Sequence, residues 1–214
     1  MTRIKICGIT THRELTDVVE LGADAVGFVV SVPRDTHREL GVEQAEELIE
    51  AAPPFVSTVL VTMGDDPKSV IDLYDRLHPD AVQLHGDVSV TALQEIRAEV
   101  DPTIIVATEP TGDRVERLAS TADGILFDSA HPDGTGGTGE VTDWVRAAEH
   151  RTALKTPIIL AGGLDSSNVT TAIEAVDPYA VDVSSGVEGP DGKKDQQQVA
   201  ELIDGVRRAE VAVA

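Results

Sequence analysis

The chain has 214 residues, of which 41% are hydrophobic, enough to build one large domain or two small ones around a sizeable core. Its formal net charge is −21, which excludes nucleic acids and anionic membranes as partners at ordinary ionic strength. A single cysteine excludes an internal disulfide, and the six histidines lack zinc-ligand spacing, so we predict no metal. No apolar stretch approaches the roughly 20 residues of a membrane span, and no signal sequence begins the chain, which predicts a cytoplasmic protein.

The charge also predicts the environment of the protein. The 38 acidic residues are scattered along the chain, and only five of the 17 basic residues are lysines, a pattern typical of proteins adapted to molar salt. At about 1 M salt the Debye length falls to about 3 Å, which screens the repulsion within a compact polyanion. We therefore expect a halophilic protein.

Short apolar runs rich in β-branched residues alternate with amphipathic stretches along the whole chain. The expected strands are residues 4–9, 25–30, 56–62, 81–85, 103–108, 124–128, 157–161 and 180–184. The expected helices are residues 13–21, 42–51, 67–77, 89–99, 112–120, 141–152, 166–176 and 195–209. Eight strand–helix units without a linker predict an α/β fold, a single (β/α)₈ TIM barrel over residues 1–214.

A doubly wound open sheet is the alternative fold. Such a sheet would be expected to carry G-x-G-x-x-G after its first strand, whereas residues 7–12 read Cys-Gly-Ile-Thr-Thr-His. The barrel is therefore favoured. In a barrel the chemistry lies at the carboxyl ends of the strands, so the polar residues at those ends are the candidate site.

Cys7, the only cysteine in the chain, lies in the first expected strand, where an apolar run stops and a turn begins. Lys5 precedes it by two residues, so both side chains lie on one face of the strand, about 7 Å apart. An ammonium at that distance would favour the thiolate and make Cys7 a better base or nucleophile. The alternatives are that Cys7 is an inert buried thiol and that Lys5 points elsewhere.

The sixth expected strand ends in Asp128, directly after three apolar residues. Partial desolvation there would raise the pKa of the carboxyl and make it a candidate general acid, although aspartates at strand ends often cap turns instead. The glycine-rich loop that follows, from Gly134 to Gly139, is either a mobile lid over the barrel mouth or a solvated connector.

The last two expected strands end in small residues. Residues 160–164 read Leu-Ala-Gly-Gly-Leu, and residues 183–187 read Val-Ser-Ser-Gly-Val. Such turns let backbone N–H groups at a helix N-terminus approach an anion. The helix end carries roughly half a positive charge, a local attraction that the screened charge of the whole protein need not defeat. These two turns predict a phosphate site.

Seven segments, taken in order, resemble the phosphoribosylanthranilate isomerases of the tryptophan pathway over nearly the whole chain. They are residues 5–10, 22–28, 82–86, 127–129, 136–139 with 143–144, 160–164, and 182–188 with 192–195. The resemblance implies an Amadori rearrangement of N-(5-phosphoribosyl)anthranilate to 1-(2-carboxyphenylamino)-1-deoxyribulose 5-phosphate, without metal or organic cofactor. It further implies that Asp128 protonates the furanose ring oxygen and that Cys7 removes the C2 proton.

The resemblance also implies substrate-binding residues. Phosphate contacts fall on the backbone around Gly163, Ser185 and Gly186. The family places an arginine against the anthranilate carboxylate in a Ser-Pro-Arg segment, but residues 31–40 here depart from that pattern and offer both Arg34 and Arg38. We favour Arg38, because residues 41–45 then fall where the family's next helix begins.

Three further residues are candidates for substrate binding. Gln83 and His85 match the family's motif and share a face of the fourth expected strand, although His85 is equally compatible with a satisfied core histidine. Asp182 would be costly to bury unpaired, so we expect it to contact substrate hydroxyls or Lys5.

Two functions are alternatives to the phosphoribosylanthranilate isomerase that the resemblance implies. One is another phosphosugar isomerase, or a dual isomerase of histidine and tryptophan synthesis, which would be expected to use paired carboxylates rather than a thiol. The other is a non-catalytic phosphate-binding barrel or a subunit of a larger biosynthetic assembly, which an intact Cys7 and Asp128 disfavour. The expected partner is a small phosphoribosyl substrate, with the chain acting as a monomer or a homodimer.

Overall fold

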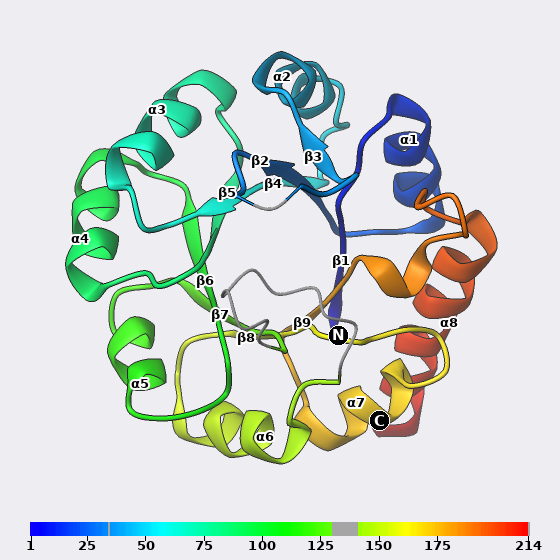
Figure 1. Cartoon of the computed structure of the whole chain (residues 1–214). Helices are drawn as coiled ribbons and strands as arrows, with labels where there is room; N and C mark the ends of the chain where they lie inside the picture. The colour runs from blue at the N-terminus through cyan, green and yellow to red at the C-terminus, as the bar shows by residue number, and fades with distance from the viewer. Residues whose placement is uncertain (34, 130–140, 214) are drawn as a thin grey trace.

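The computed structural model describes residues 1–33, 35–129 and 141–213, the side chains only as far as residue 209. Eight parallel strands form a closed barrel, because the first strand pairs both with the second and with the last. Figure 1 shows the ring of strands with the helices outside it. The strands are β1 (Arg3–Cys7), β2 (Ala25–Val30), β4 (Ser57–Met63), β5 (Ala81–His85), β6 (Thr103–Thr108), β7 (Gly124–Phe127), β8 (Ile158–Leu160) and β9 (Ala180–Val183).

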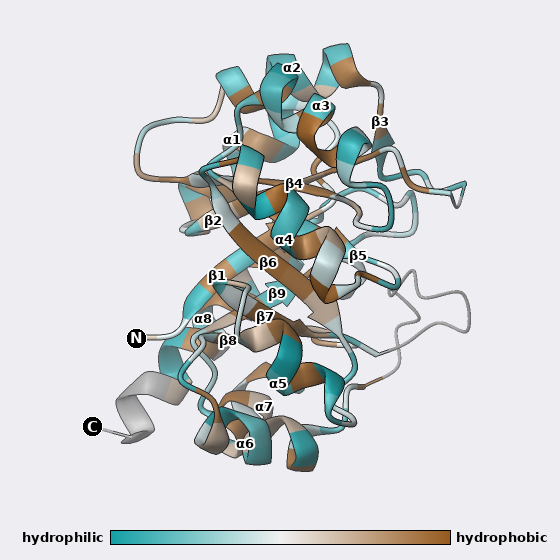
Figure 2. Cartoon of the chain, turned by 90° about the vertical axis from the view of Figure 1, so that its left-hand side faces the viewer, coloured by the Kyte–Doolittle hydropathy of each residue, from teal (hydrophilic) through white to brown (hydrophobic). Residues whose placement is uncertain are grey.

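The helices connect successive strands of the barrel. They are α1 (His12–Leu21), α2 (Val42–Glu50), α3 (Pro67–Leu77), α4 (Val90–Glu99), α5 (Arg114–Ala119), α6 (Trp144–Ala153), α7 (Val169–Val176) and α8 (Gln196–Val213). The predicted (β/α)₈ barrel is confirmed. Figure 2 shows apolar strands in the middle of the molecule and helices whose colours alternate between polar and apolar, as expected for one buried face.

Alternation along each strand divides the core into two layers. In β1, Ile4 and Ile6 point outward and pack with the helices, whereas Lys5 and Cys7 point into the barrel. The inner layer is small and mixed, with alanines and valines beside buried polar groups such as Gln83. Polar side chains inside a barrel need partners, so this layer leads directly to the candidate site.

Several elements differ from the sequence prediction: β1 ends at Cys7 rather than at residue 9, α6 begins at Trp144 rather than at residue 141, and α8 ends at Val213 rather than at residue 209. The two-residue strand β3 (Glu39–Leu40) pairs with the end of β2, and the 3₁₀ helix η1 (Ser185–Val187) follows β9; neither is expected from periodicity because both are so short. Helix α7 begins at Val169, three residues later than expected, because Asp165 and Asn168 form a hydrogen-bonded turn before it. In this turn the Asp165 carboxylate accepts from the backbone N–H of Ser167 instead of capping the helix.

Within the described residues, no helix combines the length and the hydrophobicity needed to cross a membrane.

Candidate active site

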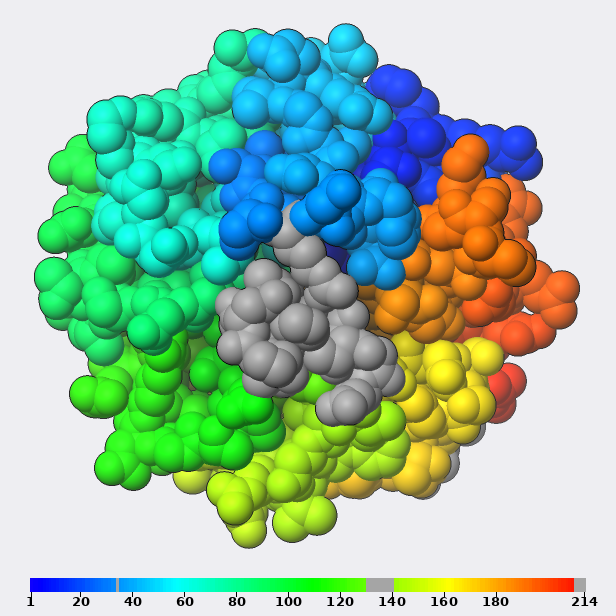
Figure 3. Space-filling model, in the orientation of Figure 1, coloured from blue at the N-terminus to red at the C-terminus, as the bar shows by residue number. Residues whose placement is uncertain are grey.

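A cavity of about 440 Å³ opens at the carboxyl ends of the strands. Figure 3 views the molecule in the orientation of Figure 1, with the blue segment between β2 and α2 beside the orange segment after β9. The predicted site residues that line the cavity are Cys7, Arg38, Gln83, His85, Asp128, Gly163, Asp182 and Ser185. Gly186 adjoins Ser185 but does not line the cavity. Arg34 and the loop from Gly134 to Gly139 lie outside the described residues.

Cys7 ends β1 with its side chain inside the barrel and 8% of its surface exposed. Gly27 on the neighbouring strand β2 leaves room for it, since a Cβ at that position would lie 2.8 Å from Cys7 Sγ and 3.0 Å from Lys5 Nζ. The backbone carbonyl of Cys7 accepts a hydrogen bond from Ser184 Oγ at 3.0 Å. Gly27 therefore leaves space for the thiol, and Ser184 holds the backbone of Cys7 at the cavity.

Lys5 lies beneath Cys7, as predicted, but its ammonium is paired with a carboxylate. Lys5 Nζ donates to both oxygens of Asp182, at 2.9 and 2.8 Å, and both residues are buried. Burial lowers the pKa of Lys5, but the Asp182 carboxylate and the neighbouring Cys7 outweigh it, so the pKa is raised overall. Of the two contacts expected for Asp182, the structure contains the one to Lys5.

Lys5 favours the Cys7 thiolate, as expected, but it does not decide the pKa of the thiol, which is raised overall. Burial raises the pKa of the Cys7 thiol, and the Asp182 carboxylate raises it further. The ammonium groups of Lys5 and Lys194 lower it, but by less. Because burial, assisted by Asp182, outweighs the two ammonium groups, the thiol form of Cys7 is favoured over the thiolate.

Gln83 and His85 lie on one face of β5 and contact each other, Gln83 Nε2 being 2.8 Å from His85 Nε2. Burial lowers the pKa of His85 to about 4, and the Lys5 ammonium contributes to the same shift, so the ring is neutral near pH 7. A neutral ring that accepts at Nε2 carries its proton on Nδ1. Among the described residues, the buried Oε1 of Gln83 has no hydrogen-bond partner, so one acceptor of a cavity-lining residue is unused.

Asp128 directly follows β7 and lines the same cavity as Cys7. Its Oδ1 accepts from the backbone N–H of Ser129 at 2.8 Å, and its own N–H donates to Thr108 O at 3.2 Å. The local turn therefore uses one carboxylate oxygen, as the capping alternative expects, while the residue still borders the cavity. Capping the turn and facing a substrate are compatible roles.

The turns after β8 and β9 approach each other closely. Gly162 and Gly163 have φ values of +80° and +61°, a conformation that glycine adopts without strain. A Cβ at Gly186 would lie 1.9 Å from Leu164 O, so no side chain fits there. Asn168 Nδ2 donates to Gly163 O at 2.8 Å, which fixes the first turn ahead of α7.

Beside the cavity the predicted Arg38 forms a cluster with two charged groups that the sequence analysis did not assign, Glu188 and Lys194. The Glu188 carboxylate accepts from Arg38 Nε and Nη2, both at 2.7 Å, and from Lys194 Nζ at 2.7 Å. Burial acts to raise the pKa of Glu188, but hydrogen bonds from Arg38 and Lys194 lower it to about 2. Glu188 and Lys194 stand in the motif segments that carry the family resemblance, which is the signal that marks them.

No group of three or more His, Cys, Asp or Glu side chains in the described ranges is arranged to hold a metal ion. The absence of metal and cofactor stays a prediction.

Residues 4–205 match the family model for N-(5'-phosphoribosyl)anthranilate (PRA) isomerase. An N-(5'-phosphoribosyl)anthranilate isomerase of Natronomonas pharaonis, from among the halophilic archaea, is 46% identical over 204 residues, 95% of this chain and 97% of the relative. A solved phosphoribosyl anthranilate isomerase in complex with reduced 1-(o-carboxyphenylamino)-1-deoxyribulose 5-phosphate has a TM-score of 0.81 and 34% identity, covering 97% of this chain and all (100%) of the other.

A further solved structure is that of mutually generated monomers of the dimeric phosphoribosylanthranilate isomerase from Thermotoga maritima. It has a TM-score of 0.81 and 32% identity, and it covers 97% of this chain and 100% of the other. Sequence and fold agree over nearly the full length of all these proteins. This chain belongs to the N-(5'-phosphoribosyl)anthranilate isomerase family.

Proposed function

We propose that this isomerase of tryptophan biosynthesis converts N-(5-phosphoribosyl)anthranilate to its aminoketose product with Cys7 as general base and Asp128 as general acid. The observation that carries the proposal is that one cavity is lined by a thiol and a carboxyl together with Arg38 and the turns after β8 and β9. The two proton-transfer groups approach that cavity from different strands, β1 and β7. A substrate between them is within reach of an acid and a base.

Asp128 protonates the furanose ring oxygen, and the sugar opens to a Schiff base. Cys7 then removes the proton from C2, which gives an enolamine that tautomerises to the ketone. Each positioned proton transfer contributes about 10² to 10⁴ in rate. Neither step needs a metal, a cofactor or a covalent bond to the enzyme.

The raised pKa of Cys7 suits a base more than a nucleophile that is permanently ionised. A thiolate of higher pKa is a stronger base, at the cost of a smaller ionised fraction. Asp182 holds the Lys5 ammonium beneath the thiol, so a positive charge is ready to stabilise the thiolate when it forms. Lys5 and Asp182 therefore act in opposite directions on the pKa of Cys7, the proposed base.

The remaining cavity residues bind the substrate. The turns bearing Gly163, Ser185 and Gly186 hold the phosphate through backbone N–H groups. Arg38 binds the anthranilate carboxylate, for which a guanidinium is well suited. The unpartnered Oε1 of Gln83 accepts a hydrogen bond from the substrate, and His85 orients the Gln83 amide.

The decay of phosphoribosylanthranilate fluorescence in molar KCl tests the proposal. Wild-type protein is expected to accelerate the decay, and Cys7→Ser and Asp128→Asn are each expected to lose more than about 10² of the rate. Circular dichroism checks that all three proteins are folded. A folded wild type that leaves the decay unchanged would rule out this substrate and favour the phosphate-binding barrel or another sugar phosphate.

The setting of the enzyme stays a prediction. We infer a monomer or a homodimer, since the phosphoribosylanthranilate isomerase of Thermotoga maritima named above is described as dimeric. A cytoplasmic location is expected for an enzyme that acts on a phosphorylated sugar of amino-acid biosynthesis.

A further inference from the structure

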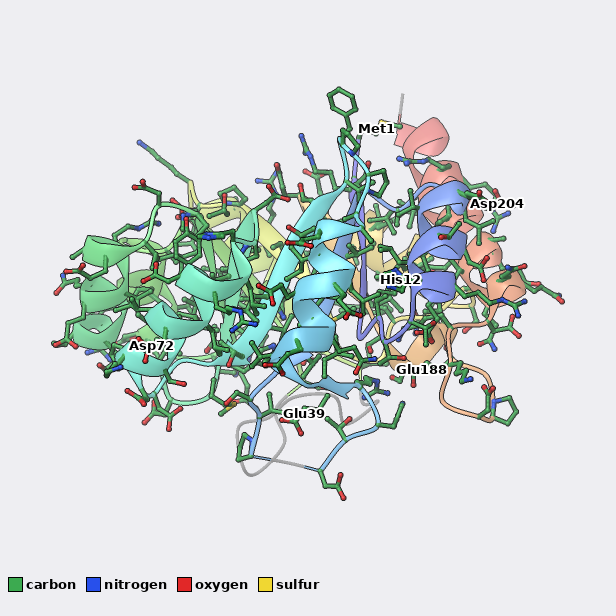
Figure 4. The ribbon with its side chains drawn as sticks, turned by 90° about the horizontal axis from the view of Figure 1, so that it is seen from above. Met1, His12, Glu39, Asp72, Glu188 and Asp204 are labelled. Carbon is green, nitrogen blue, oxygen red and sulfur yellow. The ribbon has the colours of Figure 1, made fainter. Side chains whose placement is uncertain are left out.

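Glu188 has no role in the proton transfers, yet it is buried among charged groups at the cavity edge, with 7% of its side chain exposed. Figure 4 shows Glu188 and Glu39 at the end of the barrel opposite Met1, which is the end that carries the cavity. Glu188 lies 150 residues from Arg38 along the chain, and its two carboxylate oxygens accept hydrogen bonds from the Arg38 guanidinium. This bidentate contact determines which part of the guanidinium is left for a ligand.

A guanidinium offers its donors along distinct edges, and Glu188 occupies the edge formed by Nε and Nη2. Nη1 has no hydrogen-bond partner in the part of the chain that the structure describes. Arg38 lines the cavity and keeps 20% of its side chain exposed. An anion in the cavity therefore meets the other edge of Arg38, formed by Nη1 and the second N–H of Nη2.

Further contacts of Lys194 and of the Arg38 side chain hold the cluster in place. Lys194 Nζ donates to Glu188 Oε1 at 2.7 Å and to Ser184 O at 3.2 Å, and its side chain is 1% exposed. The aliphatic part of Arg38 lies across Gly8, where a Cβ would be 2.7 Å from Arg38 Cδ. Arg38 thus has little freedom to swing its free end to a different position.

We propose that Glu188 is a specificity-determining positioning residue, which holds Arg38 so that its free end meets the carboxylate only at the ortho position of the substrate's aromatic ring. The inference rests on the proposed function, in which Arg38 binds that carboxylate. With Glu188 and Lys194 both ionised, the cluster keeps a net charge of +1, so the clamp fixes the guanidinium without cancelling its attraction for an anion.

The test compares two ligands of equal charge. They are the reduced amino-sugar phosphates made from 2-aminobenzoate and from 4-aminobenzoate, which differ only in where the carboxylate sits on the ring. Removing Glu188 changes the electrostatic attraction for both ligands to about the same extent. The ratio of their dissociation constants therefore reports the position of Arg38 and cancels most of the charge effect.

The variants are Glu188→Ala, which frees Arg38, and Glu188→Gln, which keeps the side-chain volume and breaks the bidentate contact. Calorimetric titration is expected to show a strong preference of the wild type for the ortho ligand. In both variants this preference should fall by about fivefold to tenfold, because an immobilised side chain is worth about that much in binding.

The matched control is Glu46→Gln, which breaks a contact of the same kind on the surface. Arg76 donates from Nε and Nη2 to Glu46 at 3.0 and 2.7 Å, between α2 and α3. The Glu46→Gln variant should have the same preference for the ortho ligand as the wild type. If the Glu188 variants shift both dissociation constants by the same factor, the inference is overturned while the proposed function stands. If the wild type fails to bind the ortho ligand, the proposed function itself is overturned.

Discussion

Cys7 fits beside β2 only because the neighbouring residue, Gly27, has no side chain. Gly27→Ala would place a Cβ 2.8 Å from Cys7 Sγ, and the thiol must move because the strand backbone cannot. A displaced base loses its alignment with the C2 proton, so kcat should fall by on the order of 10². Steady-state fluorescence kinetics of the purified variant measure the loss.

The control for that substitution is Gly124→Ala, also at a strand glycine. Its Cβ would meet Ile105 Cγ1 at 3.5 Å, an ordinary van der Waals contact. Activity should stay within about threefold of wild type, since the change is away from the reacting groups. Equal losses in the two variants would mean that Gly27 matters for packing rather than for the position of Cys7.

The Glu188 cluster predicts a specific acid sensitivity of the fold. The pKa of Glu188 is lowered to about 2 from 4.5, so its contribution to stability is complete above about pH 4.5 and is lost as pH falls toward 2. At pH 7 this contribution is about 3 kcal/mol, because one unit of pKa corresponds to about 1.4 kcal/mol. Urea unfolding of wild type and Glu188→Gln should show a stability difference that shrinks across that interval. A stability difference between the two proteins that does not change with pH would contradict the stabilising role of the ionised Glu188.

Individual residues differ in how well the sequence predicts them. The faces of Cys7 and Lys5 follow from the alternation of a strand, which is local. The pairing of Lys5 with Asp182 is one of two expected contacts, because a buried carboxylate needs a partner. The pairing of Arg38 with Glu188 joins positions 150 residues apart, and pattern along the chain does not predict it. Lys5 lowers the pKa of Cys7, as predicted, but burial of the thiol outweighs this effect, and the depth of burial does not follow from local pattern.

At the scale of elements, the turns after β8 and β9 act as one unit. Gly186→Ala would place a Cβ 1.9 Å from Leu164 O and force the two turns apart. Since both turns hold the phosphate in the proposed function, KM should rise by about tenfold or more. The control is Gly41→Ala at the start of α2, where a Cβ meets nothing within 4 Å. An unchanged KM in Gly186→Ala would place the phosphate elsewhere.

The strands and helices of the barrel follow from sequence periodicity, because each long element has one face to bury. The start of α7 does not, since side chains of Asp165 and Asn168 compete for the backbone before the helix begins. Strand β3 has two residues and depends on its pairing with β2, so nothing in its own sequence marks it. Local sequence pattern therefore predicts the strands and helices that carry the site better than it predicts the loops between them.

At the scale of the whole molecule, the charge of −21 predicts a dependence on salt. The Debye length falls from about 10 Å at 0.1 M to about 3 Å at 1 M salt, so most of the self-repulsion is screened in that interval. The free energy of unfolding in urea should rise steeply between 0.1 and about 1 M KCl and then level off. A stability that is constant or falls with KCl would contradict the expected halophily.

The most direct test of the proposed mechanism is the kinetic isotope effect with phosphoribosylanthranilate deuterated at C2. If Cys7 removes the C2 proton, Cys7→Ser replaces the base by a poorer one, and proton removal becomes rate-limiting. We predict a primary isotope effect on kcat in Cys7→Ser that is larger than in Asp128→Asn, where ring opening limits the rate. A Cys7→Ser variant without an isotope effect would contradict the assignment of Cys7 as the base.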